Sequence, residues 1–378
     1  MASADGGSRH AERAPPTRES SPPLFAALDL GTNNCRLLVA APEGSYFRVI
    51  DAFSRNVRLG EGVERTGALS SAAMGRTIDA LRICAGKIRK HRVRDVRIIA
   101  TEACRRASNG PEFLERVRRE TGLRMELITP HEEARFAIAG CAPLLDPAAE
   151  HLMVFDIGGG STELIWVDLS GAPRERREEL VMSLAPRDGG VRDQVAEVQA
   201  SGARIVDWVS APVGVATLHD KFNDVPDDRK RYALMSWFFE EKLEQFGPYE
   251  ESASKDLLPM LQIIGASGTV TTLGSLHLGL RKYDRSRVDG LWLDAADIGR
   301  HVHDLIDMGP MGRVGHPSIG SDRAQLVIAG AAILQTILRI WPVQRIRVAD
   351  RGLREGMLYS MMQPMARRGG AAAEKEAE

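Results

Sequence analysis

The sequence lacks the features that mark disulfide-linked, zinc-binding or nucleic-acid-binding proteins. Only four of its 378 residues are cysteines, Cys35, Cys84, Cys104 and Cys141, and no two of them form a CxxC pair. Scattered cysteines of this kind are typical of reduced thiols in a cytoplasmic protein, so we expect neither disulfides nor zinc. The formal net charge is −1. A balanced charge gives no overall attraction to nucleic acid or to an acidic membrane, and we expect neither as a partner.

A long uninterrupted apolar run is also missing. The most apolar stretch, residues 325–341, is interrupted by Gln335 and Arg339. It is too short and too polar for a membrane span and predicts a buried helix. Residues 1–23 are polar and proline-rich without the apolar core of a signal peptide, so we expect a disordered leader there and a disordered tail over 367–378.

What the sequence does contain is an alternation of strand and helix patterns, which is typical of α/β architecture. Apolar strand patterns and helical periodicity alternate from Leu24 onward. Strands are predicted over 24–30, 33–41, 95–101 and 124–130, and helices over 70–91, 110–122, 131–145, 189–209 and 227–246. Residues 261–280 predict a strand, a glycine loop and a helix, and 344–358 repeat that order.

The chain length and a candidate linker indicate more than one domain. The linker is LDPAAE, which begins at Leu145. We expect a first domain over 24–145 and a second over 146–352. A C-terminal helix over 353–366 follows, for which packing against the first domain is an option.

One pattern occurs twice. LDLGTNNCRLL (28–38) and FDIGGGSTELI (155–165) each combine a strand, an aspartate, a glycine turn and a second strand. Asp29 therefore corresponds to Asp156, and Gly31 to Gly158. Two copies of one hairpin suggest two related domains that face each other across a cleft.

The glycine turns predict phosphate binding. Backbone N–H groups of a tight turn converge on a small concavity that attracts anions, and a missing Cβ lets a phosphate approach. The alternative is a plain hairpin turn, for which one or two glycines suffice. A third glycine segment precedes a predicted helix and adds a helix N-terminus. The predicted phosphate-binding residues are Gly31, Thr32, Asn33, Asn34, Gly158, Gly159, Gly160, Ser161, Gly265, Ser267 and Gly268.

Carboxylates border both turns. Asp29, Asp156 and Glu163 would repel a bound phosphate unless a divalent cation lies between them, and oxygen ligands suit Mg²⁺ or Mn²⁺. The alternative is that the aspartates only cap their turns. Two aspartates at equivalent places beside a glutamate favour the metal.

Two further segments carry candidate catalytic groups. In ATEACRRA, Arg105 or Arg106 follows a predicted strand end, where α/β proteins place ligands. In HEEARFA, Glu132 and Glu133 begin a predicted helix. Acidic residues there can simply complement the helix dipole, but a glutamate near a phosphate can also activate water.

Together these segments resemble the exopolyphosphatase / guanosine pentaphosphate phosphohydrolase family. The similarity rests on ALDLGTNNCRLL, RLGEGVERTGALS, ATEACRRA, EEARFA, VFDIGGGSTEL, IIGASGTVTTL and GLREGML, in this order over about residues 24–358. The resemblance implies two ribonuclease-H-like, actin-like ATPase domains that flank an active-site cleft. It implies Mg²⁺-dependent hydrolysis of a terminal phosphate of polyphosphate or guanosine pentaphosphate, and a homodimer.

By motif match, the resemblance assigns roles to single residues. Glu133 matches the water-activating base, Arg105 the phosphate-contacting arginine, and Asp156 and Glu163 the metal and active-site carboxylates. Longer family members carry an extra helical domain after GLREGML. The resemblance therefore leaves open how tightly and how processively this chain binds long polyphosphate. It also does not choose between polyphosphate and guanosine pentaphosphate.

Two rival functions are a kinase or ATPase of the same superfamily, and a binding protein that senses guanosine tetra- or pentaphosphate or polyphosphate without turnover. The sequence offers no clear acceptor-activating aspartate or adenosine pocket for a kinase. A sensor would not need the full set of carboxylates, so the sequence favours a hydrolase.

Overall fold

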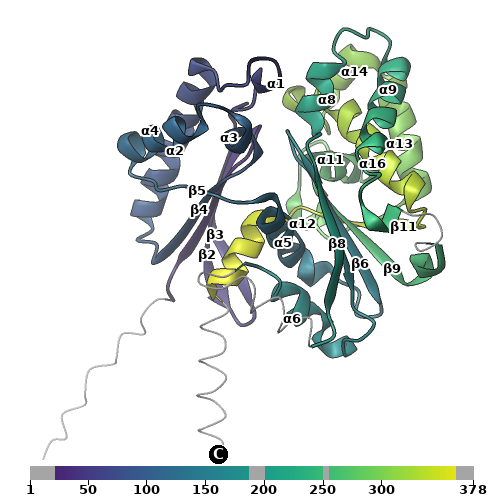
Figure 1. Ribbon diagram of the computed structural model, residues 1–378, viewed down its shortest axis with the longest axis horizontal. Helices are drawn as coiled ribbons and strands as arrows, with labels where there is room; N and C mark the ends of the chain where they lie inside the picture. The colour runs from purple at the N-terminus through teal and green to yellow at the C-terminus, as the bar shows by residue number, and fades with distance from the viewer. Residues whose placement is uncertain (1–21, 187–200, 250–254, 363–378) are drawn as a thin grey trace, which may run out of the picture.

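The computed structural model describes residues 22–186, 201–249 and 255–362 (Figure 1). The expected leader, apart from residues 22 and 23, and the expected tail lie outside these ranges. Two β-sheets stand side by side, and each has helices on its outer face (Figure 1). No described helix is both long and apolar enough to cross a membrane.

The first sheet has five strands in the order β3-β2-β1-β4-β5. Its strands are β1 (Phe25–Leu30), β2 (Asn34–Glu43), β3 (Tyr46–Asn56), β4 (Asp95–Ala100) and β5 (Glu126–Leu127). β1 is antiparallel to β2 and parallel to β4, so the first three strands form a meander and the next two are added by crossovers.

The second sheet has six strands in the order β10-β11-β9-β6-β7-β8. Its strands are β6 (His151–Ile157), β7 (Thr162–Asp168), β8 (Arg204–Ala211), β9 (Leu261–Ser267), β10 (Trp292–Asp294) and β11 (Arg345–Ala349). β6 is antiparallel to β7 and parallel to β9. Read from β8 to β11, this sheet therefore has the topology of the first, with β10 added at the edge.

The repeat in the sequence is thus a repeat of the fold. In the first hairpin the Gly31 N–H donates to the Asn34 carbonyl oxygen over 3.0 Å, and in the second the Gly158 N–H donates to Ser161 over 2.9 Å. The strand ends of each hairpin pair in the same register. Both turns consequently point into the space between the sheets.

Helices cover the outer faces by burying their apolar sides. The helices are α1 (Val63–Thr66), α2 (Ser71–Lys90), α3 (Glu102–Arg106), α4 (Gly110–Thr121), α5 (Pro130–Cys141), α6 (Arg177–Met182), α8 (Val215–Lys221), α9 (Asp228–Glu241), α11 (Gly268–His277), α12 (Arg285–Val288), α13 (Ala295–Asp307), α14 (Gly309–Gly315), α15 (Ser321–Ala324) and α16 (Val327–Ile340). α2 and α4 share a core with the first sheet. α9, α11, α13 and α16 share the largest core with the second sheet. The predicted buried helix over 325–341 is confirmed as α16.

Two helices lie between the sheets, namely α5 and the helical residues 353–362 (Figure 1). α5 contributes to one core with β6, β7 and β9 and to another with β1, β2 and the C-terminal helix. The two helices touch through their backbones, because a Cβ on Gly140 would lie 1.9 Å from the Gly352 carbonyl oxygen. A Cβ on Gly356 would likewise lie 2.1 Å from the Phe136 carbonyl oxygen. The domain limits remain a prediction, since α5 packs on both sheets.

The structure corrects one predicted helix. Residues 189–200 of the predicted 189–209 helix lie outside the described ranges, but 204–211 form strand β8. Its sequence RIVDWVSA pairs with β7, and the β-branched residues and tryptophan suit a half-buried edge strand. The prediction for 124–130 was also too long, since β5 spans only Glu126–Leu127. Strand β3 had no prediction.

Candidate active site

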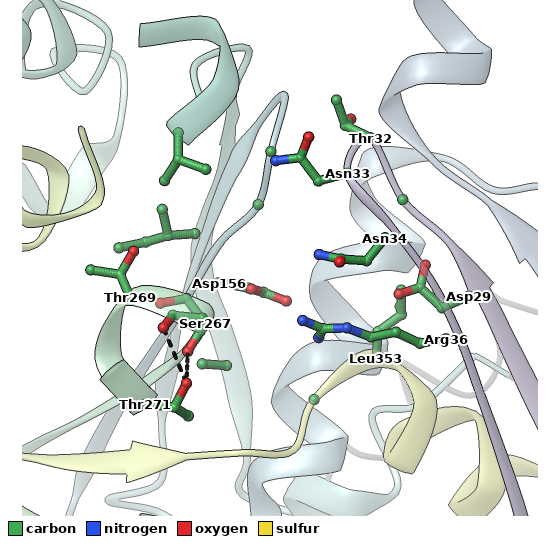
Figure 2. Close-up of a pocket in the computed structure, with 18 of the residues that line it drawn as sticks. Asp29, Thr32, Asn33, Asn34, Arg36, Asp156, Ser267, Thr269, Thr271 and Leu353 are labelled. Atoms are coloured by element: carbon green, nitrogen blue, oxygen red, sulfur yellow. Dashed lines mark hydrogen bonds between the residues drawn. The ribbon is translucent and has the colours of Figure 1, made fainter. Parts of the chain in front are cut away.

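A cavity of about 400 Å³ lies between the two hairpin turns (Figure 2). Both copies of the sequence repeat line it, together with the loop between β9 and α11 and the loop after β11. The predicted site residues that line it are Asp29, Gly31, Thr32, Asn33, Asn34, Glu133, Asp156, Gly158, Gly159, Gly160, Ser161, Glu163, Ser267 and Gly268. Residues far apart in the sequence are therefore brought together as the repeat implied.

The first wall of the cavity is the end of the β1–β2 hairpin. Asp29 and Arg36 are direct cross-strand partners, and Ser54 on β3 continues the same row. Alternate residues of a strand share a face, so Asn34 lies beside Arg36 on the cavity side. Figure 2 shows both side chains directed toward Asp156 on the opposite wall.

The second wall is the turn of Gly158, Gly159 and Gly160. None of the three has a positive φ, so the backbone conformation alone does not require glycine. The close approach of the other hairpin does require glycine, because a Cβ on Gly159 would lie 3.0 Å from the Asn33 side chain. The first helical amides of α8 bind the outer side of this turn, where Val215 N–H donates to the Gly158 carbonyl oxygen over 3.0 Å.

The third loop joins β9 to α11. Ser267 caps α11, and its hydroxyl accepts from the Val270 N–H over 3.0 Å. Gly268 has open space around its missing Cβ, which leaves the helix N-terminus accessible to an anion. Gly265 does not line the cavity, because it lies inside β9, where a Cβ would be 2.4 Å from the Phe155 ring. Core packing therefore requires a glycine at position 265.

Four of the carboxylates that line the cavity, Asp29, Glu133, Asp156 and Glu163, have raised pKa values. Burial, followed by repulsion from Glu133, raises the pKa of Asp156 to about 7. Burial, followed by repulsion from Asp156, raises the pKa of Glu163 to about 7, although Ser210 donates a hydrogen bond to it over 2.8 Å. Burial, with Glu163 as the next cause, also raises the pKa of Glu133 well above its ordinary value. Burial raises the pKa of Asp29, while Arg36 opposes this increase.

This carboxylate group fits a divalent cation held jointly with a ligand. The Asp29 Oδ1 atom is buried and accepts no hydrogen bond. Within the described residues, however, no three His, Cys, Asp or Glu side chains come together closely enough to hold a metal ion. Mg²⁺ commonly takes one or two carboxylates and completes its coordination with water and substrate phosphates. Asp29, Asp156 and Glu163 therefore suit a shared site better than a closed protein cage.

Arg105 and Glu133 are brought together, although no contact between them was predicted, and Arg105 does not line the cavity. Its Nη1 donates to Glu133 Oε2 over 2.8 Å and to the Ile128 carbonyl oxygen over 2.9 Å. Its Nη2 donates to Glu102 Oε2 over 2.9 Å. Glu133 lines the cavity whereas Arg105 does not. Arg105 thus orients the glutamate from behind, and its predicted phosphate contact remains a prediction.

The sequence analysis missed the cations that do line the cavity. These are Arg36 on β2, Arg323 before α16, and Arg351 and Arg354 after β11. Arg36 had a detectable signal, because it occupies the place in the first hairpin that Glu163 occupies in the second. Residues 87–106 contain eight lysine or arginine residues, and a basic segment of this kind could have supplied charge to the site. All of it is described, and none of the eight side chains lines the cavity. Its Lys87 instead pairs with Asp51 over 2.7 Å.

Known proteins resemble this chain in sequence and in fold. A model of the Ppx/GppA phosphatase family matches residues 38–365. A curated relative, the guanosine-5'-triphosphate,3'-diphosphate pyrophosphatase of Aeromonas salmonicida (strain A449), is 26% identical over 340 residues, or 90% of this chain. The chain spans 60% of the length of that relative.

Solved structures with similar folds include two from Aquifex aeolicus. One, described as a member of the Ppx/GppA protein family, has a TM-score of 0.69 at 29% identity over 91% of this chain and 98% of that one. The other, a PPX-GPPA enzyme, has a TM-score of 0.68 at 30% identity over 89% and 99%. An exopolyphosphatase from Cytophaga hutchinsonii ATCC 33406 has a TM-score of 0.72 at 23% identity over 90% and 98%, which shows the fold alone. The predicted α/β class with two ribonuclease-H-like, actin-like ATPase halves is thereby confirmed.

Proposed function

The chain belongs to the Ppx/GppA phosphatase family, and from this premise we propose that it hydrolyses a terminal phosphoanhydride of polyphosphate or of guanosine pentaphosphate. The observation that carries the proposal is Glu133, a largely buried glutamate whose side chain is 14% exposed, lines the cavity and is held by Arg105 over 2.8 Å. The two glycine turns suited to phosphate line the same cavity.

Glu133 is the group that would activate water. Burial raises its pKa well above the ordinary value, so the carboxylate is a stronger base than a solvent-exposed glutamate. In the proposed step the water oxygen forms a bond to the terminal phosphorus while its proton moves to Glu133. The bridging P–O bond breaks, and the shortened phosphate chain leaves with the electron pair. Arg105 acts by fixing the orientation of Glu133.

The cavity walls would bind the phosphates. Backbone amides of the two turns and of the α11 N-terminus supply neutral donors, and Arg36 and Arg354 supply positive charge. Burial lowers the pKa of Arg354, Glu355 opposes this decrease, and repulsion from Arg36 adds to it. This arrangement favours a ligand that carries several negative charges.

A divalent cation, Mg²⁺ or Mn²⁺, fits the proposal. Asp29, Asp156 and Glu163 are the side chains that would hold it, and the ion would neutralise phosphate charge when bound. Without it, these carboxylates would repel the ligand. We further propose a homodimer located in the cytoplasm, with the polyanionic substrate as its small-molecule partner.

A phosphate-release assay tests the proposal. Purified chain is incubated with polyphosphate, guanosine pentaphosphate or ATP, each with Mg²⁺, with Mn²⁺ or with a chelator. We expect metal-dependent release from one or both of the first two substrates and little from ATP. Release from ATP alone would favour a superfamily ATPase, and tight binding of guanosine pentaphosphate without release would favour a sensor.

A further inference from the structure

Glu102 adds a further carboxylate to a cavity suited to polyanions, and the mechanism above does not use it. It begins α3, immediately after strand β4 and Thr101. Its side chain is 12% exposed and lines the cavity. A negative charge at this place weakens phosphate binding unless a cation pairs with it. The contacts of Glu102 identify Arg105 as that cation.

Glu102 holds Arg105 from the side opposite Glu133. The Arg105 Nη2 donates to Glu102 Oε2 over 2.9 Å, while Nη1 donates to Glu133 Oε2 over 2.8 Å. The Ile128 carbonyl oxygen accepts a second bond from Nη1 over 2.9 Å. Both terminal nitrogens of the guanidinium are therefore engaged, and Arg105 is 15% exposed.

Glu102 also touches the glycine turn of the opposite wall. A Cβ on Gly160 would lie 3.2 Å from Glu102 Cγ. The stem of Glu102 thus packs against the turn while its carboxylate faces away toward Arg105. This packing limits the rotamers of Glu102, and a fixed carboxylate in turn fixes the arginine.

We propose that Glu102 is a positioning residue that keeps Arg105 bonded to Glu133. This inference rests on the proposed function. An arginine is a long side chain with many rotamers, and each bond to its guanidinium restricts them. By occupying Nη2, Glu102 directs the arginine to the base. Its effect should therefore appear in the chemical step and not in substrate binding.

The first test compares Glu102→Gln with Glu64→Gln. Glu64 is a matched control, because it pairs with Arg106 of the same helix over 2.5 Å and does not line the cavity. Glutamine can still accept from Arg105 but lacks the charge that strengthens the bond, so we expect Glu102→Gln to lower kcat roughly 10-fold with KM nearly unchanged. Glu64→Gln should leave both constants unchanged. Glu102→Asp, which keeps the charge, should recover part of kcat. Thermal unfolding of each variant checks that the fold is intact.

The second test repeats Glu102→Gln in an Arg105→Ala background. If Glu102 acts only through Arg105, it has no further effect on kcat there. A lower KM with unchanged kcat in Glu102→Gln would instead mean that Glu102 merely repels substrate. That result, or equal losses with and without Arg105, would overturn the assignment. If the wild type releases no phosphate from polyphosphate or guanosine pentaphosphate, the proposed function fails and this role fails with it. An active wild type with an unaffected Glu102→Gln refutes the role of Glu102 alone.

Discussion

Gly160 of the second sheet lies against Thr32 of the first, so closely that a Cβ on Gly160 would be 2.8 Å from the threonine Oγ1. The two residues belong to equivalent hairpin turns separated by more than a hundred positions in the chain. Glycine is needed there because the Thr32 side chain packs against the turn, and this reason exists only in the folded molecule.

Replacing Gly160 with alanine should reduce hydrolysis without unfolding the protein. The added Cβ would push Thr32 or the turn itself outward by a few tenths of an ångström or more, which misplaces the phosphate-binding amides. Misplacement of a positioned group by about 1 Å can cost about 10²-fold in rate. The measurement is kcat/KM for phosphate release.

Gly86 offers the matched control for that substitution. It lies within α2, and a Cβ there would meet no atom within 4 Å. Gly86→Ala should keep full activity and stabilise the fold by about 0.5–1 kcal/mol, because alanine loses less backbone freedom in a helix. Equal activity of the two alanine variants would refute the close-contact explanation.

Glu133→Gln should remove most of the hydrolytic activity. The amide keeps the shape of the side chain and cannot accept the proton of water, so we expect kcat to fall about 10²- to 10⁴-fold. Glu132→Gln is the control, since Glu132 caps α5 by accepting from the Thr129 N–H over 2.9 Å, a bond that glutamine can also make. Near wild-type turnover in Glu133→Gln would show that another group activates the water.

Arg36→Gln should weaken substrate binding more than turnover. Arg36 lines the cavity beside Asp29 and supplies positive charge where a polyanion would lie. A hydrogen bond to a charged group is worth about 1.5–3 kcal/mol, which corresponds to an increase in KM of about 10- to 100-fold. Arg48→Gln, at an exposed position of β3 outside the cavity, should bind substrate like the wild type. The two variants are compared by steady-state kinetics at equal ionic strength.

The stability of the first sheet should depend on pH through Asp51. Hydrogen bonds from Lys87 at 2.7 Å and from His91 at 2.8 Å lower the pKa of Asp51 to about 2. Because folding lowers this pKa, ionised Asp51 stabilises the fold at pH values above its unfolded pKa of about 3.9. This stabilisation is lost as the pH falls toward 2.

Asp51→Asn isolates this effect. Asp51 and its partners are partly exposed. We therefore expect Asp51→Asn to lower the free energy of unfolding by on the order of 1 kcal/mol at pH 7 and much less near pH 2. Urea unfolding at several pH values measures the difference. Asp79→Asn, which breaks an exposed pair with Arg82, should show little dependence of this kind. A constant difference between wild type and Asp51→Asn across pH would contradict the proposed ion-pair origin.

Some parts of the structure were predictable because they depend on neighbouring residues. α5 carries its own start signal, since Thr129 and Glu132 form a capping box and Pro130 occupies the first turn. The two hairpins were recognisable because each strand–turn–strand unit is local. Strand β8 was not predicted, because an edge strand gains its stability from pairing with β7, which lies far away in sequence.

The sequence by itself determined the α/β class, the duplicated hairpin, the family and fourteen of the residues that line the cavity. Only the tertiary structure decided which of these side chains contact one another and which arginines line the cavity. Arg105 follows a strand end, and only the fold shows that Glu102 and Glu133 both accept hydrogen bonds from it. Arg36, Arg323 and Arg354 reach the cavity from three separate segments. Ion pairs and cavity walls depend on side chains meeting across the two sheets, and no spacing within one segment specifies which ones meet.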